Sequence, residues 1–151
     1  MKLAEALSIR KDLQKRIEQL SSRIENNVKV QEGDEPSEQP SELLKELDSC
    51  LRQLEELIIK INKTNISVVA DGVSLTEMMA RRDVLMKRLE VLRTVFDKAS
   101  GSENRYSRSE IKFVSTIDVK QLSKTIDKYS QQLRELDIEI QTLNFTHDLL
   151  E

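Results

Sequence analysis

The sequence predicts a mainly α protein: four long antiparallel helices that pack like a coiled coil, with a small β element. Three observations support this fold class. Charged residues make up 34% of the 151 residues and aromatic residues only 3%, a balance typical of long helices with narrow apolar seams. Apolar residues recur at alternating steps of three and four along four stretches. The three glycines and two prolines fall between those stretches.

The most regular stretch is 118–144. At about 1.5 Å per residue it predicts a helix about 40 Å long, and Asp118 is expected to cap its start. Eight apolar side chains form one stripe along it, and so regular a stripe needs other helices to cover it. They are Val119, Leu122, Ile126, Tyr129, Leu133, Leu136, Ile140 and Leu143.

A second helix is expected over residues 2–30, with an apolar stripe that Arg10 and Asn27 interrupt. Polar residues in a seam either fix register and subunit number, or face water where the stripe drifts. The second interpretation is favoured for both residues. A third helix is expected over 75–99, where Ser74 and Glu77 form a capping box.

The remaining helix is expected over residues 42–64, with Ser41 as its cap. Flanking Leu43, Cys50 and Leu57 widen its stripe, so we expect it to be the most buried helix and Cys50 to be a small buried hydrophobe. The expected seam consists of Leu44, Leu47, Leu51, Leu54, Ile58 and Ile61.

The connections between these helices differ in character. Residues 31–41 are acidic and contain both prolines, so we expect a mobile linker inside a single domain over 1–151. Residues 66–73 are rich in β-branched side chains and contain the turn signal Asp71-Gly72, which predict a short strand or hairpin. Residues 111–117 alternate like a strand. We expect these two connections to pair into a two- or three-stranded sheet.

Composition excludes several function classes. A single cysteine rules out an intrachain disulfide and a cysteine-based metal cluster, and the one histidine has no ligand-spaced partner. No glycine-rich phosphate loop is present. A net charge of −3 opposes nucleic-acid binding. The N-terminus resembles no signal peptide and no apolar run is long enough for a membrane span, so we expect a soluble cytoplasmic protein without a cofactor.

One group of residues has the chemistry of an anion site. Guanidinium and ammonium groups beside hydroxyls and amides suit a phosphate or carboxylate. The alternative is a structural network, in which Arg82 and Arg108 pair with Asp83, Glu110 or a carboxylate of a second subunit. The candidates are Arg81, Arg82, Arg105, Tyr106, Arg108, Lys112, Asn62, Thr64 and Asn65.

Six segments of unusual sequence span the whole chain: MKLAEAL at 1–7, VQEG at 30–33, IN and TN within 61–65, ARRD at 80–83, RYSRSEIK at 105–112 and RELD at 134–137. Together they resemble the septicolysin-like family of small bacterial proteins. Phe145 departs from that pattern, in which a tryptophan is expected. The resemblance implies little about activity, because that family is mostly of unknown function. Its name implies a thiol-activated cytolysin, for which these residues offer no support.

The sequence therefore favours a non-enzymatic structural or interaction protein that assembles with itself, as anything from a dimer to a hexamer. Regular seams around a thin core are the reason. One alternative is a protein that binds a small phosphate- or carboxylate-bearing anion through the arginine group. Another is a septicolysin-type cytolysin that acts on membranes. Neither a nucleic acid nor a membrane is the expected partner.

Overall fold

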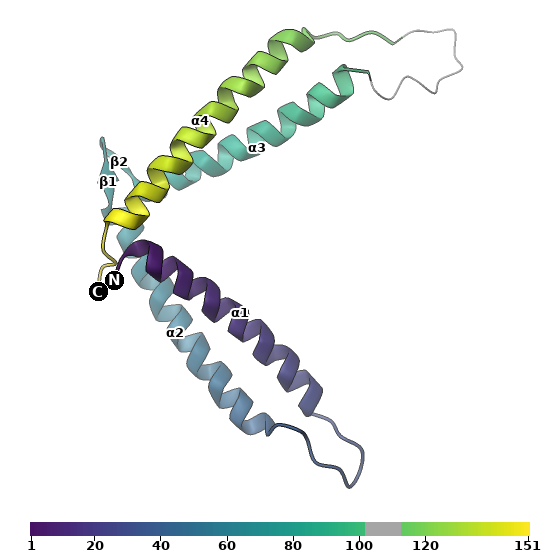
Figure 1. Cartoon of the computed structure of the whole chain (residues 1–151), viewed down its shortest axis with the longest axis vertical. Helices are drawn as coiled ribbons and strands as arrows, with labels where there is room; N and C mark the ends of the chain where they lie inside the picture. The colour runs from purple at the N-terminus through teal and green to yellow at the C-terminus, as the bar shows by residue number, and fades with distance from the viewer. Residues whose placement is uncertain (102–112) are drawn as a thin grey trace. The chain divides into compact units, whose positions relative to one another are not determined.

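A computed structural model describes residues 1–101 and 113–151 and confirms the mainly α fold class. Within these residues lie four helices, α1 (Leu3–Asn27), α2 (Pro40–Ser67), α3 (Leu75–Ala99) and α4 (Val119–Thr146). A hairpin of two short strands, β1 (Val69–Ala70) and β2 (Val73–Ser74), connects α2 to α3 (Figure 1).

The chain divides into two compact units, each built around a helix pair. The first unit comprises Met1–Ala70 with Leu143–Glu151, and the second comprises Asp71–Thr142. In each unit two helices run side by side in opposite directions, α1 with α2 and α3 with α4 (Figure 1). The expectation of a single domain stays a prediction.

The α1–α2 pair has a dry core. Leu20, Leu43 and Cys50 are buried together, and Leu13, Ile17, Ile24 and Leu47 pack against them. Cys50 is only 4% exposed, which confirms it as a small buried hydrophobe. Arg16 of α1 reaches Glu46 of α2 along the polar edge of this core, with 2.9 Å between Nε and Oε1.

The seam of α2 differs from the expected one. The line that is buried runs through Leu43, Cys50, Leu57, Ile61 and Thr64. Leu44 and Leu51, expected in the seam, are 50% and 46% exposed. The flank that was expected to widen the stripe is thus the face packed against α1. One partner helix covers one stripe, so the other apolar stripe of α2 is left open.

Two expectations at the α1–α2 connection were wrong. The helix begins at Pro40 after Gln39, so Ser41 is not the cap. Proline is favoured in a first turn because its missing N–H has no partner to lose there. Asn27 does not face water: it is buried, donates to the Arg23 carbonyl at 2.8 Å and accepts from the Glu38 N–H at 3.0 Å.

The two ends of the chain are joined inside the first unit. The Leu3 N–H donates to the His147 carbonyl at 3.0 Å, and the Leu149 N–H donates to the Met1 carbonyl at 2.9 Å. The Leu150 N–H donates to the buried Thr64 hydroxyl at 3.0 Å. These hydrogen bonds satisfy backbone groups at the two chain ends, which would otherwise fray, and they hold the C-terminal residues against α1 and α2.

The hairpin explains why the expected sheet did not form as predicted. Asp71 and Gly72 both have positive φ, 50° and 79°, as a tight two-residue hairpin turn requires. Val69–Ala70 therefore pairs with Val73–Ser74, so the predicted hairpin forms almost entirely within the 66–73 connection. The expected strand over 111–117 is not seen: residues 113–117 carry no strand, and residues 111 and 112 lie outside the described part of the chain.

Both helices of the second pair start at the expected caps. The Ser74 hydroxyl accepts from the Glu77 N–H at 3.2 Å, and the Glu77 carboxylate accepts from the Ser74 N–H at 2.8 Å, which completes the capping box. The Asp118 carboxylate accepts from the Gln121 N–H at 3.0 Å. Each cap satisfies an N–H that has no partner within the helix.

Candidate functional site

The expected arginine group is only partly described. Arg81 is exposed on α3. Its neighbour Arg82 is half-buried and forms an ion pair with Asp83, with 3.0 Å between Nη2 and Oδ1. That pair is the structural alternative expected for Arg82. The other basic and aromatic members, Arg105, Tyr106, Arg108 and Lys112, lie outside the described residues.

The polar members from the end of α2 have different environments. Asn62 is exposed, whereas Thr64 and Asn65 are buried. The Thr64 hydroxyl donates to the Lys60 carbonyl at 2.8 Å while it accepts from Leu150, so it is engaged in structure. All three belong to the first unit, and Arg81 and Arg82 belong to the second. That these residues form one anion site stays a prediction.

A groove runs between α3 and α4 within the second unit. Its volume is about 510 Å³ and most of its lining is apolar. Arg81 and Arg88, which are seven residues apart on α3, both line it. The lining residues are Ala80, Arg81, Val84, Leu85, Arg88, Tyr129, Gln132 and Leu136.

Arg88 has an unusual environment in this groove. Its guanidinium carbon lies 4.8 Å from the centre of the Tyr129 ring, and its Nη1 donates to the Tyr129 hydroxyl at 2.7 Å. The ring face attracts a cation but leaves its charge in place. Among the described residues, no carboxylate oxygen lies within 4 Å of the Arg81 or Arg88 guanidinium. The groove therefore combines an apolar floor with two guanidinium groups that form no close ion pair among the described residues, although the charge of Arg81 also acts on Glu77 of the same helix.

Sequence reasoning missed Arg88. The signal was present, because Arg81 and Arg88 are seven residues apart and share one face of a helix. Val84 lies between them on that face and is 64% exposed, and Val91 continues the line and is 51% exposed. We call Arg81, Val84, Arg88, Val91 and Val95 the α3 stripe.

The α4 seam is regular but poorly covered. Of its eight apolar members, all in the described part of the chain, only Ile140 is buried, and the other seven are half-buried. On the opposite helix α3, Leu75, Met78 and Leu89 are buried. The α4 side of the second pair is therefore less completely covered than its α3 side.

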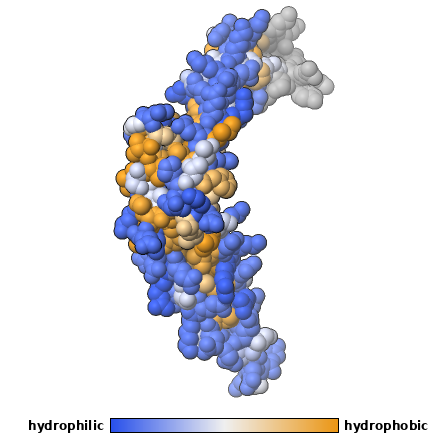
Figure 2. Space-filling view, turned by 60° about the vertical axis from the view of Figure 1, so that its left-hand side comes forward, coloured by the Kyte–Doolittle hydropathy of each residue, from blue (hydrophilic) through white to orange (hydrophobic). Residues whose placement is uncertain are grey.

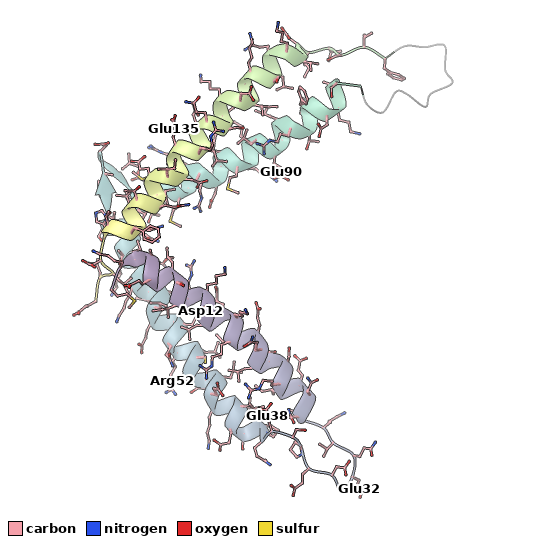
Figure 3. The ribbon with its side chains drawn as sticks, viewed as in Figure 1. Asp12, Glu32, Glu38, Arg52, Glu90 and Glu135 are labelled. Atoms are coloured by element: carbon pink, nitrogen blue, oxygen red, sulfur yellow. The ribbon has the colours of Figure 1, made fainter. Side chains whose placement is uncertain are left out.

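A further apolar line lies on α2. Leu44 and Leu51 are exposed, Ile58 is half-buried, and acidic residues Asp48 and Glu55 alternate with them. Figure 2 shows hydrophobic surface interspersed with the hydrophilic side chains. Asp48 forms an exposed ion pair with Arg52, labelled in Figure 3, with 3.0 Å between Oδ2 and Nη2. We call Leu44, Asp48, Leu51, Glu55 and Ile58 the α2 stripe.

Among the residues that the structure describes, three carboxylates have lowered pKa values, and each forms local hydrogen bonds. Hydrogen bonds from Arg23 lower the pKa of Glu38, which precedes α2 (Figure 3). The backbone N–H and hydroxyl of Ser74 lower the pKa of Glu77. A hydrogen bond from Lys2, followed by its charge, lowers the pKa of Asp148. Each of these hydrogen bonds favours the charged form of the carboxylate.

The described residues contain no cluster of three or more histidine, cysteine or acidic side chains able to hold a metal ion. No helix in the described ranges is both long and apolar enough to cross a membrane.

Comparison with known proteins places the chain in a family. No curated protein matches it. It is similar to a solved structure described as "a functionally unknown conserved protein from Corynebacterium diphtheriae", with 37% sequence identity, a TM-score of 0.95 and 99% of each chain covered. Residues 10–149 match DUF6847, a family of unknown function. The chain therefore belongs to the DUF6847 family.

Proposed function

We propose that this protein is a non-enzymatic, self-assembling protein with a structural or interaction role, and that it works as a homo-oligomer. The observation that carries the proposal is the α4 seam. Its apolar residues keep the coiled-coil pattern over four heptads, yet within one chain only Ile140 is buried.

The free energy of burying apolar side chains favours coverage of the α4 seam by another chain. Fully burying a leucine-sized side chain contributes about 1.5–3 kcal/mol, so a half-buried stripe of this length forgoes several such contributions. A second copy brings apolar stripes of the same kind.

The test is the native mass of purified protein by light scattering over a dilution series. Assembly predicts a mass that is a multiple of 17.5 kDa. Ile126→Gln, in the half-buried seam of α4, should lower that mass or shift dissociation to higher concentration. Lys128→Gln, exposed on the same helix, is the matched control and should change neither. A wild-type mass of 17.5 kDa at every concentration would contradict the proposal.

A second candidate is a protein that binds a small carboxylate- or phosphate-bearing ligand. The apolar groove with Arg81 and Arg88 favours it, because apolar walls with a few charged groups are typical of ligand sites. Native mass spectrometry of the purified protein should then reveal a co-purifying anion. That anion should be lost in Arg81→Ala with Arg88→Ala while the oligomer mass is unchanged, whereas assembly through the arginines predicts that these substitutions alter the mass.

The resemblance to the septicolysin-like family leaves a membrane-active cytolysin as a third candidate. It predicts release of a trapped dye from phospholipid vesicles by the purified protein. Because the buried Cys50 is the only thiol, release should then depend on that residue and be lost in Cys50→Ala.

A further inference from the structure

We propose that the α2 stripe of one copy docks into the α3–α4 groove of a second copy, with Asp48 and Glu55 facing Arg81 and Arg88. The inference rests on the proposed self-assembly and identifies the two surfaces that make it. The α2 stripe lies within the first unit, and the groove lies within the second.

The first argument is spacing. Asp48 and Glu55 are seven residues apart on α2, and Arg81 and Arg88 are seven residues apart on α3. At about 1.5 Å per residue, both pairs span about 10.5 Å along their helices. A helix carrying two acids at this spacing matches a helix carrying two bases at this spacing, whether the two run parallel or antiparallel.

The second argument is alternation. On the α2 stripe Leu44, Leu51 and Ile58 alternate with the acids, and on the α3 stripe Val84 and Val91 alternate with the bases. Apolar residues can therefore meet apolar residues while charges meet charges. The same contact would bury the exposed apolar side chains of both stripes away from water.

The third argument is the state of the charges. Neither arginine has a carboxylate within 4 Å among the described residues, and within the same ranges Glu55 has no cation within that distance. Asp48 is paired with Arg52, but an exposed pair of this kind on one helix is weak and can be exchanged for another partner. Docking thus places carboxylates beside two guanidinium groups that have no carboxylate within 4 Å in the described part of their own chain, where Arg81 acts on Glu77 only without a close ion pair.

The fourth argument is what the contact covers. The groove is lined by Tyr129 and Leu136, two half-buried members of the α4 seam. An occupant of the groove therefore completes part of the seam that carries the proposed function. Each copy has one α2 stripe and one groove, so copies that pair this way form a two-fold dimer, a ring or an open filament, depending on the rotation between them.

The test is charge reversal in two full-length variants. One carries Asp48→Lys and Glu55→Lys, the other Arg81→Glu and Arg88→Glu. Each variant alone places like charges opposite each other, which should raise the dissociation constant at least about tenfold in sedimentation experiments. An equimolar mixture restores opposite charges at every contact between the two kinds of chain. Assembly of the mixture should return to within about threefold of wild type, because charge complementarity is restored.

The control is Glu18→Lys with Glu25→Lys. These exposed residues of α1 have the same spacing and the same change of charge, and this variant should assemble like wild type. Circular dichroism checks that each variant is folded. Arg81→Glu alone keeps the Arg88–Tyr129 contact and provides a milder variant, which should weaken assembly in the same direction.

The outcomes separate this inference from the proposed function. If wild type assembles and neither reversal weakens it, the docking surfaces are wrong and self-assembly stands. If reversal weakens assembly but mixing does not restore it, the acid-to-base pairing between copies is also wrong. If an anion co-purifies with wild type and is lost from the Arg81→Glu, Arg88→Glu variant while the mass of the oligomer is unchanged, the groove binds a ligand and not a second copy. A monomeric wild type overturns both proposals.

Discussion

The two helix pairs of this protein have the same dimensions and different packing. α1 and α3 are 25 residues each, and α2 and α4 are 28 each. The first pair encloses Leu20, Leu43 and Cys50. An ion pair between Arg16 of α1 and Glu46 of α2 joins the two helices at the edge of this core. In the second pair the cross-helix polar contacts run from Arg88 to Tyr129 and from Arg93 to Ser130, so they leave the arginine charges uncompensated.

The comparison teaches that a regular heptad does not guarantee burial. The α4 seam has the most regular pattern in the chain, yet the better-buried core belongs to α1, whose pattern Arg10 and Asn27 interrupt. Burial depends on what lies opposite a stripe, which the stripe itself does not encode. The α4 seam of the second pair is only partly covered within the described residues.

The largest expected effect contrasts one leucine from each pair. Leu20→Ala removes a fully buried side chain and should lower the free energy of unfolding by about 2–5 kcal/mol. Leu133→Ala truncates a half-buried seam residue, so its loss should be smaller in dilute protein and should grow with protein concentration as copies cover the seam. Thermal melts at several concentrations measure both. A Leu133→Ala loss independent of concentration would contradict the contrast.

The next effect concerns how the first unit is closed. Thr64→Val removes the hydroxyl that accepts from the Leu150 N–H, so a part-buried donor loses its partner. The free energy of unfolding in urea should fall by about 1–3 kcal/mol. Thr64→Ser keeps the hydroxyl and should retain most of the stability. Equal losses in both variants would mean that packing of the threonine methyl, and not this hydrogen bond, matters.

The second pair offers a matched test at its helix starts. Ser74→Ala removes the cap of α3 and Asp118→Ala removes that of α4, and each should lower the free energy of unfolding by about 1 kcal/mol. Ser74→Asn and Asp118→Asn keep a side-chain acceptor and should lose much less. Alanine variants as stable as wild type would show that these helix ends do not limit the stability of the second pair.

The smallest effect is a dependence on pH in the first pair. Arg23 lowers the pKa of Glu38 in the folded protein, so the ion pair stabilises the fold above the unfolded pKa of about 4.5. This contribution is lost as the pH falls through the lowered folded pKa. Melting temperatures of wild type and Glu38→Gln should therefore differ at pH 7 and converge in acid. A constant difference across that range would contradict the assignment.

Local signals predicted much of the fold. The bounds of α3 agree with the expected 75–99, and the Ser74–Glu77 and Asp118 caps form as their spacing predicted. These features depend on neighbours within a few residues. A short strand or hairpin around the Asp71-Gly72 turn was also predicted, and the hairpin forms, but the further strand expected in 111–117 is not seen in the described residues 113–117.

Features that depend on distant partners were harder to predict. Which stripe of α2 faces α1 could not be read from α2, because both stripes are apolar and only the opposite helix decides between them. Asn27 was expected to face water, since its role depends on the backbone N–H of Glu38 beyond the helix end. Arg88 was overlooked because its partner Tyr129 lies on another helix.

The central claim is that the open seam of the second helix pair is covered by another copy of the chain. Sedimentation equilibrium of wild-type protein from nanomolar to high micromolar concentration tests it most directly. The account predicts a defined multiple of 17.5 kDa that dissociates on dilution. A mass of 17.5 kDa across the whole range would contradict it.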